Sequence, residues 1–92
     1  MLFVIFCLDK AGSGPARLEH YDEHKAYLAT APHKTIMSGP LTTDDDKTMI
    51  GSLFLVETDD RKALEKFVAD DPFNKANVWN QIEIRAFRKR VG

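Results

Sequence analysis

Cysteine is nearly absent from the sequence, since Cys7 is the only one among 92 residues. A single thiol excludes an internal disulfide and any metal site built from several cysteines. We expect Cys7 on a buried strand of a protein in a reducing compartment. The chain also lacks an excess of one charge, because it has 13 basic and 14 acidic residues. This balance argues against nucleic acids and anionic membrane surfaces as partners.

Long apolar segments are missing as well, because no stretch approaches the roughly 20 apolar residues that a membrane-spanning helix needs. The apolar N-terminal run lacks a positively charged leading segment, and Asp9 and Lys10 interrupt it with no small-residue cleavage site after them. We therefore expect a cytoplasmic protein. Hydrophobic residues make up 43% of the chain and charged residues 29%, which is typical of one globular domain over residues 1–92.

Apolar periodicity predicts four strands and two helices in the order β-α-β-β-α-β. The expected strands are Met1–Leu8, Lys34–Ser38, Gly51–Glu57 and Val78–Phe87, and the expected helices are Ala16–Ala31 and Arg61–Asp70. Residues 11–15 and 41–49 are predicted loops, and Pro32 ends the first helix. This order indicates an α+β, ferredoxin-like fold, with a four-stranded antiparallel sheet and two helices on one face.

The first and third predicted strands are apolar on both faces. Leu53 and Leu55, for example, alternate with Phe54 and Val56, so each face of that strand carries two large apolar side chains. Two helices can cover only one face of a four-stranded sheet. We therefore expect a homodimer, or a higher even oligomer, in which two sheets pack face to face.

The first predicted helix places two functional side chains on its apolar stripe. Arg17 and His24 are seven residues apart, two turns along one face, and both lie within about 60° of Tyr21. Lys25 and the apolar residues Leu18 and Leu28 share that stripe. A solvated helix would place a cation and an imidazole on the opposite face, so we expect them to point toward the core or a pocket.

Asp71 lies seven residues beyond Leu64 and continues the inner stripe of the second predicted helix. An imidazole transfers protons near neutral pH, and a carboxylate on its other nitrogen fixes the tautomer. His24 and Asp71 are therefore the predicted catalytic pair. Arg17 could hold an oxyanion, with Ser38 and Ser52 as hydroxyl donors.

Each of these assignments has a structural alternative. His24 could be a core histidine and Asp71 a helix-ending residue, while Arg17 could extend its head to water. Ser38 and Ser52 could serve packing alone. His20 and His24 have the i, i+4 spacing of metal ligands, but the intervening residues do not make HExxH and no third ligand is evident. We therefore expect no metal.

Several short motifs in order resemble the YciI-like (YCII-related) family. They are the opening strand MLFVIFCLDK, Arg17 followed by His24 and Leu28, Ser38-Gly39-Pro40, Gly51-Ser52, Asp71-Pro72-Phe73 and the closing Phe87-Arg88-Lys89. The resemblance covers nearly the whole chain. It implies a ferredoxin-like fold, a dimeric α/β barrel and a site centred on histidine and aspartate in a cleft, an architecture shared with muconolactone isomerase-type proteins.

The resemblance also implies an activity, because one family member of similar size is a dehydrochlorinase of a chlorinated hydroxyhydroquinone. The chain departs from the usual family pattern at His20 and in the acidic loop Asp44–Asp46. Pro72 and Phe73, which belong to the last motif before the final strand, join the expected substrate contacts.

The sequence thus predicts a small cofactor-free enzyme that moves protons on a compact cyclic or aromatic substrate. Elimination, such as dehydrochlorination of a chlorinated hydroxyquinol, or isomerisation suits a base paired with an oxyanion holder. Two alternatives remain open at this point. One is a non-catalytic ligand-binding or regulatory dimer that uses the same cleft, and the other is a structural interaction partner with an exposed apolar patch and no enclosed pocket.

Overall fold

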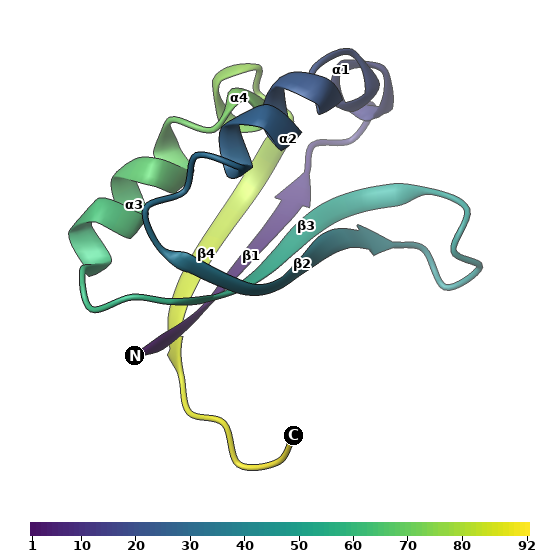
Figure 1. Ribbon diagram of the computed structural model, residues 1–92. Coiled ribbons are helices and arrows are strands. Elements are labelled where there is room, and N and C mark those ends of the chain that lie inside the picture. The colour runs from purple at the N-terminus through teal and green to yellow at the C-terminus, as the bar shows by residue number, and fades with distance from the viewer.

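The computed structural model describes all 92 residues. Its elements are β1 (Leu2–Asp9), α1 (Gly14–Glu19), α2 (Tyr21–Leu28), β2 (Lys34–Thr42), β3 (Met49–Glu57), α3 (Arg61–Ala69), α4 (Pro72–Lys75) and β4 (Trp79–Phe87). The predicted alternation of strands and helical regions is confirmed (Figure 1). Each helical region consists of two helices rather than one.

The four strands form one antiparallel sheet in the order β2-β3-β1-β4. All four helices lie on the same face of this sheet (Figure 1). The predicted α+β, ferredoxin-like fold is therefore confirmed. None of the helices has both the length and the apolar character needed to cross a lipid bilayer.

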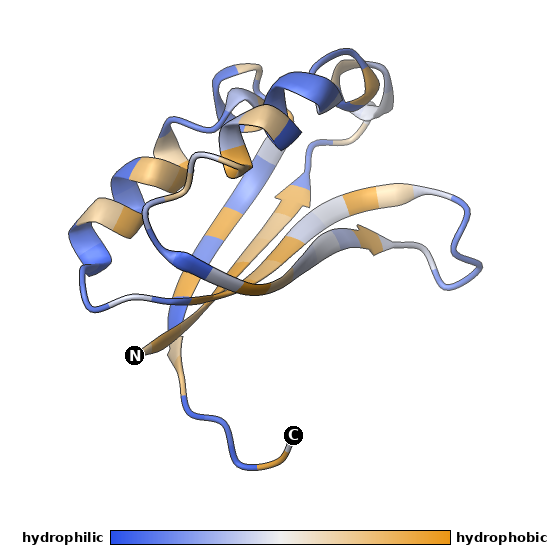
Figure 2. Ribbon diagram, in the orientation of Figure 1, coloured by the Kyte–Doolittle hydropathy of each residue, from blue (hydrophilic) through white to orange (hydrophobic).

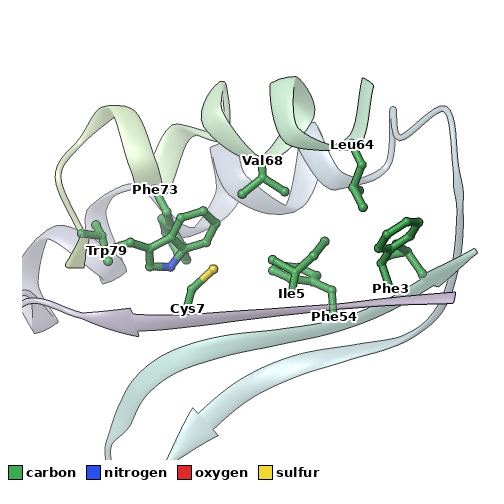
Figure 3. Packing of buried hydrophobic residues seen from close by; sticks show 10 residues of the cluster. Phe3, Ile5, Cys7, Phe54, Leu64, Val68, Phe73 and Trp79 are labelled. Atoms are coloured by element: carbon green, nitrogen blue, oxygen red, sulfur yellow. The ribbon is translucent and has the colours of Figure 1, made fainter. Parts of the chain in front are cut away.

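The hydrophobic core fills the space between the helices and the sheet. Alternate residues of the two central strands supply its floor, and α3 supplies Leu64 and Val68 from above (Figure 3). The strand residues on this face are Phe3, Ile5, Cys7, Phe54 and Val56. Burying one large apolar side chain completely stabilises the fold by about 1.5–3 kcal/mol. Cys7 lies on a buried strand, as predicted.

The first helical region differs from the predicted single helix. It starts earlier, because Pro15 occupies the first turn, where its missing N–H is not needed. It is interrupted at His20, which has φ −100° and ψ 6°. Within α1, Leu18 lies about 100° around the helix axis from its neighbour Arg17, so the two side chains do not share a face. Leu18, predicted on the inner stripe, is 69% exposed, whereas Arg17 and His24 are 3% and 5% exposed.

The second helical region ends sooner than predicted, and Asp71 does not continue its stripe. The helix α3 begins at an Asp60 N-cap, whose side chain accepts the Ala63 N–H at 3.0 Å. The residue before a proline is restricted to extended conformations, and Asp71, with ψ 136°, precedes Pro72. Asp71 is therefore the N-cap of α4, and its carboxylate accepts the Phe73 N–H at 2.8 Å.

The strand β2 is longer than predicted and continues through Gly39 and Pro40 to Thr42, so the hairpin loop shortens to residues 43–48. Proline removes a backbone donor, and strands tolerate it at the edge of a sheet. The position of β2 at the sheet edge explains why Pro40 does not end it.

The sheet face opposite the helices is apolar along its central strands and carries the charged Glu83 and Arg85 on β4, and no helix or strand of the chain covers it. Figure 2 shows apolar residues along the central strands, and Figure 1 shows no element beneath them. Half-buried side chains on this face are Leu2, Val4, Phe6, Leu53 and Leu55, and the more exposed Met37 and Phe87 extend it. An apolar face of this extent is typical of a protein–protein contact.

Gly51 is required at its position in β3, because a Cβ there would lie 2.2 Å from the Cys7 carbonyl oxygen. We expect Gly51→Ala to lower the free energy of unfolding by about 2–3 kcal/mol, since neither backbone can move freely within the sheet. Urea denaturation followed by circular dichroism measures this change. Gly39→Ala in β2 is the matched control, because a Cβ at that position would have no atom within 4 Å. Equal stability of the two variants would contradict this account.

Candidate active site

The buried guanidinium of Arg17 joins three elements. From α1, Arg17 Nε donates to Asp9 Oδ2 at 2.8 Å and Nη2 donates to Asp9 Oδ1 at 3.2 Å, at the end of β1. Nη2 also lies 2.7 Å from the Gly51 carbonyl oxygen and 2.8 Å from Ser52 Oγ, both in β3. The Arg17 and Asp9 side chains are 3% and 7% exposed. Sequence reasoning missed Asp9, whose only signal was its place directly after an apolar strand.

The predicted pair of His24 and Asp71 is in contact. His24 Nδ1 lies 2.8 Å from Asp71 Oδ1, and both side chains are almost completely buried. An ionised carboxylate only accepts hydrogen bonds, so Nδ1 is the nitrogen that donates to Asp71, and Nε2 is the nitrogen left to exchange a proton. Nε2 makes no hydrogen bond within the chain and is not enclosed in the core. A second hydrogen bond, from the Phe73 N–H, holds the same Asp71 oxygen in place.

Phe73 supports this pair and does not line the cleft, which corrects its predicted role as a substrate contact. Its side chain is 0% exposed. Its ring stacks on the His24 imidazole with 3.9 Å between centroids and 7° between planes. The Arg17 Cζ atom lies 4.8 Å from the same ring centroid. Phe73 therefore contacts both the His24 and the Arg17 side chains from within the core.

Pro72 is also absent from the cleft. It borders a separate surface hollow on the other side of α2, together with His20 and Glu23. His20 Nδ1 lies 3.3 Å from Glu23 Oε1 in that exposed region, so His20 does not share a site with His24. Pro72 acts instead through its backbone, because it starts α4 and so places the Asp71 cap.

A cleft of about 280 Å³ opens between α1 and α2 on one side and β2 and β3 on the other. It brings together four of the predicted site residues, Arg17, His24, Ser38 and Ser52. The remaining lining residues are Tyr21, Lys25, Leu28, Gly39, Pro40 and Phe54. Asp71 lies behind His24 and does not reach the cleft. A single six-membered ring with small substituents fits a space of this size.

Tyr21 and Lys25 line the cleft although sequence reasoning assigned them no functional role. Lys25 Nζ lies 4.6 Å from the centroid of the Tyr21 ring, in cation–π contact. Their signal in the sequence was the stripe that they share with His24. Only the position of β2 opposite α2 shows that this part of the stripe faces a cleft rather than the core.

Cys7 lies close to the site but has the properties of a core residue. Burial raises the pKa of the Cys7 thiol to about 12, and the negative charges of Asp71 and Asp9 act in the same direction. The thiol therefore stays protonated at neutral pH, and its side chain is fully buried. The thiolate, which is the nucleophilic form, is not populated there.

The family model of the YCII-related domain matches residues 1–88. The chain belongs to this family. Protein YciI of Escherichia coli is 27% identical to it over 96 residues, which cover 97% of this chain and 98% of that protein. An uncharacterized protein of Haemophilus influenzae is 26% identical over the same length and covers equal shares. The family resemblance read from the sequence is confirmed.

A solved structure shares the fold of this YCII-related domain closely. It is the 5-chloro-2-hydroxyhydroquinone dehydrochlorinase of Burkholderia phenoliruptrix in complex with 2,5-dihydroxybenzoquinone. The two chains are 34% identical with a TM-score of 0.85, and the match covers 96% of this chain and 94% of the other. An antibiotic biosynthesis monooxygenase, at 19% identity and a TM-score of 0.56, shares the fold alone.

The Arg17–Asp9 pair makes a testable contribution to stability. We expect Arg17→Met to lower the free energy of unfolding by about 3–5 kcal/mol, because Asp9 would remain buried without a cation. Urea denaturation measures the loss, and the double variant with Asp9→Asn should recover part of it. The control is Lys66→Met, which breaks an exposed pair with Asp70 and should change stability by less than about 1 kcal/mol. A loss no larger than in this control would contradict the role assigned to Arg17.

Proposed function

We propose that the cleft is the active site of a small enzyme that transfers protons on a compact oxygenated ring and needs no cofactor. One observation carries the proposal. His24 lines the cleft with an unpaired Nε2, while its Nδ1 lies 2.8 Å from the buried carboxylate of Asp71. A histidine held in this way is equipped to act as a general base and then as a general acid.

The proton transfer follows from this geometry. His24 Nε2 takes a proton from the bound substrate, and the ring becomes an imidazolium. Asp71 stabilises that cation and keeps the proton on Nδ1, so the ring presents the same nitrogen to the substrate throughout. Stacking on Phe73 holds the imidazole plane in the required direction. The proton returns from Nε2 to a different substrate atom.

The proposed reaction also needs hydrogen-bond donors for the oxyanion that develops on the substrate. Ser52 Oγ accepts a hydrogen bond from Arg17 Nη2, so its own hydroxyl proton is free for donation into the cleft. Arg17 Nη1 makes no hydrogen bond within the chain, and Ser38 adds a second hydroxyl. Hydrogen bonds that exist before the reaction stabilise the charge as it forms.

Elimination of HCl from a chlorinated hydroxyhydroquinone is the most concrete version of this chemistry. One hydroxyl proton moves to the ring carbon that bears chlorine, and a second is removed by base as chloride leaves. The product is a hydroxyquinone, and neither an oxidant nor a reductant is required. A base that takes and returns protons suits both steps. The name of the Burkholderia relative, which is 34% identical, supports this substrate class.

Replacement of His24 tests the proposal. We expect His24→Gln to lower chloride release from 5-chloro-2-hydroxyhydroquinone by about 10²–10⁴-fold, because the general base is lost. A chloride-selective electrode follows the reaction. His20→Gln is the control, since His20 lies at the helix break and outside the cleft, and it should retain wild-type turnover.

The outcomes separate the candidate functions. Full turnover by His24→Gln would refute the acid–base pair. Binding of 2,5-dihydroxybenzoquinone without turnover of chlorinated hydroxyquinols, muconolactones or related ring compounds would instead identify a non-catalytic ligand-binding protein. Isothermal calorimetry measures that binding directly.

The uncovered face of the sheet supports a second part of the proposal, that the protein acts as a homodimer. Two copies packed through this face would bury its apolar side chains. We expect the wild-type protein to sediment as a dimer at micromolar concentration and Leu55→Lys, in the middle of the face, to sediment as a monomer. Leu18→Lys is the matched control, because Leu18 is exposed in the helical layer, and it should remain dimeric. A monomeric wild-type protein would contradict the proposal.

A further inference from the structure

The cleft has an uneven set of charged groups. Two permanent cations, Arg17 and Lys25, are among its lining residues, and three hydroxyl groups accompany them. No aspartate or glutamate side chain lines it. The hollow on the other side of α2 differs in this respect, because Glu23 and Asp70 line it. The cleft is therefore complementary to a ligand rich in negatively charged oxygen atoms.

Arg17 and Lys25 do not contribute equally to the attraction of the cleft for negatively charged ligands. Arg17 forms a two-point ion pair with Asp9 at 2.8 and 3.2 Å, and both side chains are almost fully buried. At such short range the field of the guanidinium is largely cancelled for any third group. Arg17 thus supplies directed N–H donors but little net positive charge.

Lys25 is the less tightly paired of the two cations, and its side chain is 56% exposed. Its one carboxylate neighbour is Asp22, at 3.7 Å from Nζ, and the Asp22 side chain is 97% exposed. Water screens a pair of this kind strongly. The centroid of the Tyr21 ring lies 4.6 Å from Nζ, and both residues line the cleft.

We propose that Lys25 is the residue that makes the cleft selective for anionic ligands, so that its substrates bind as phenolates or similarly ionised ring oxygens. This inference rests on the proposed function only in taking the cleft as the ligand site. Lys25 pairs with an ionised oxygen at the mouth of the cleft. The ring then lies against Leu28, Pro40 and Phe54, within reach of His24.

Two quinones that differ in charge test the inference. The hydroxyl groups of 2,5-dihydroxybenzoquinone are vinylogous acids and are ionised at neutral pH, whereas its dimethyl ether is neutral. We expect Lys25→Met to weaken binding of the anion about fivefold at low ionic strength and to leave binding of the ether unchanged. Lys25→Glu should weaken binding of the anion further, and added salt should reduce both effects. Isothermal calorimetry measures the affinity of each protein for each quinone.

Lys62→Met and Lys62→Glu are the matched controls, because they change the net charge equally from an exposed position outside the cleft. They should bind both quinones as the wild type does. Three results would each overturn the inference. They are wild-type affinity for the anion in both Lys25 variants, an equal loss of affinity in the Lys62 variants, and no binding of the anion at millimolar concentration. These are equilibrium binding measurements, so their outcome does not depend on catalysis. If binding is charge-selective and depends on Lys25 but no substrate is turned over, only the catalytic proposal is refuted.

Discussion

The buried guanidinium of Arg17 is the interaction on which the arrangement of this molecule depends. It fixes α1 against the end of β1 through Asp9 and against the start of β3 through Gly51 and Ser52. A charge in this position is tolerated only because an opposite charge and several acceptors surround it. These contacts place α1 over the end of the sheet where β1 ends and β3 begins, and the cleft lies directly beside them.

The centre of the site uses backbone geometry as much as side-chain chemistry. Asp71 caps α4, and the N–H that it accepts belongs to Phe73, whose ring in turn supports His24. Three consecutive residues therefore supply the Asp71 carboxylate, the N–H whose hydrogen bond it accepts, and the ring that stacks on His24. The local turn that starts a short helix also orients the His24 imidazole, so a change in this turn alters both the fold and the cleft.

Much of the fold could be predicted from the sequence because short apolar runs rich in strand-forming residues mark the central strands. The apolar character of both faces of β1 and β3 followed from these runs, although the chain itself fully buries only the face toward the helices. The break at His20 could not be predicted, because no proline or glycine marks it. The prediction still placed Arg17 and His24 correctly on the inner face, because each lies within a regular helix on its own side of the break.

The pairing of His24 with Asp71 was predicted from their stripes, but Asp71 reaches its position by capping α4 rather than by continuing α3. Asp9 and the supporting role of Phe73 were not predicted. Both depend on contacts between residues far apart in the chain, and no local pattern records such contacts. Sequence reasoning found four of the polar side chains that line the cleft and the partner of His24, and it missed the groups that hold them.

The edge position of β2 has a consequence for how the shape of the cleft can be changed. One wall of the cleft belongs to the densely packed helical layer, where His24, Arg17 and their supports leave little room for change. The other wall, Ser38-Gly39-Pro40, lies on a strand with one free side and a polar loop after it. A change in the loop after this strand would alter the shape offered to a ligand while His24 and Arg17 stay in place. One wall of the cleft is thus held by packing of the helical layer, and the other is held by the pairing of a single edge strand.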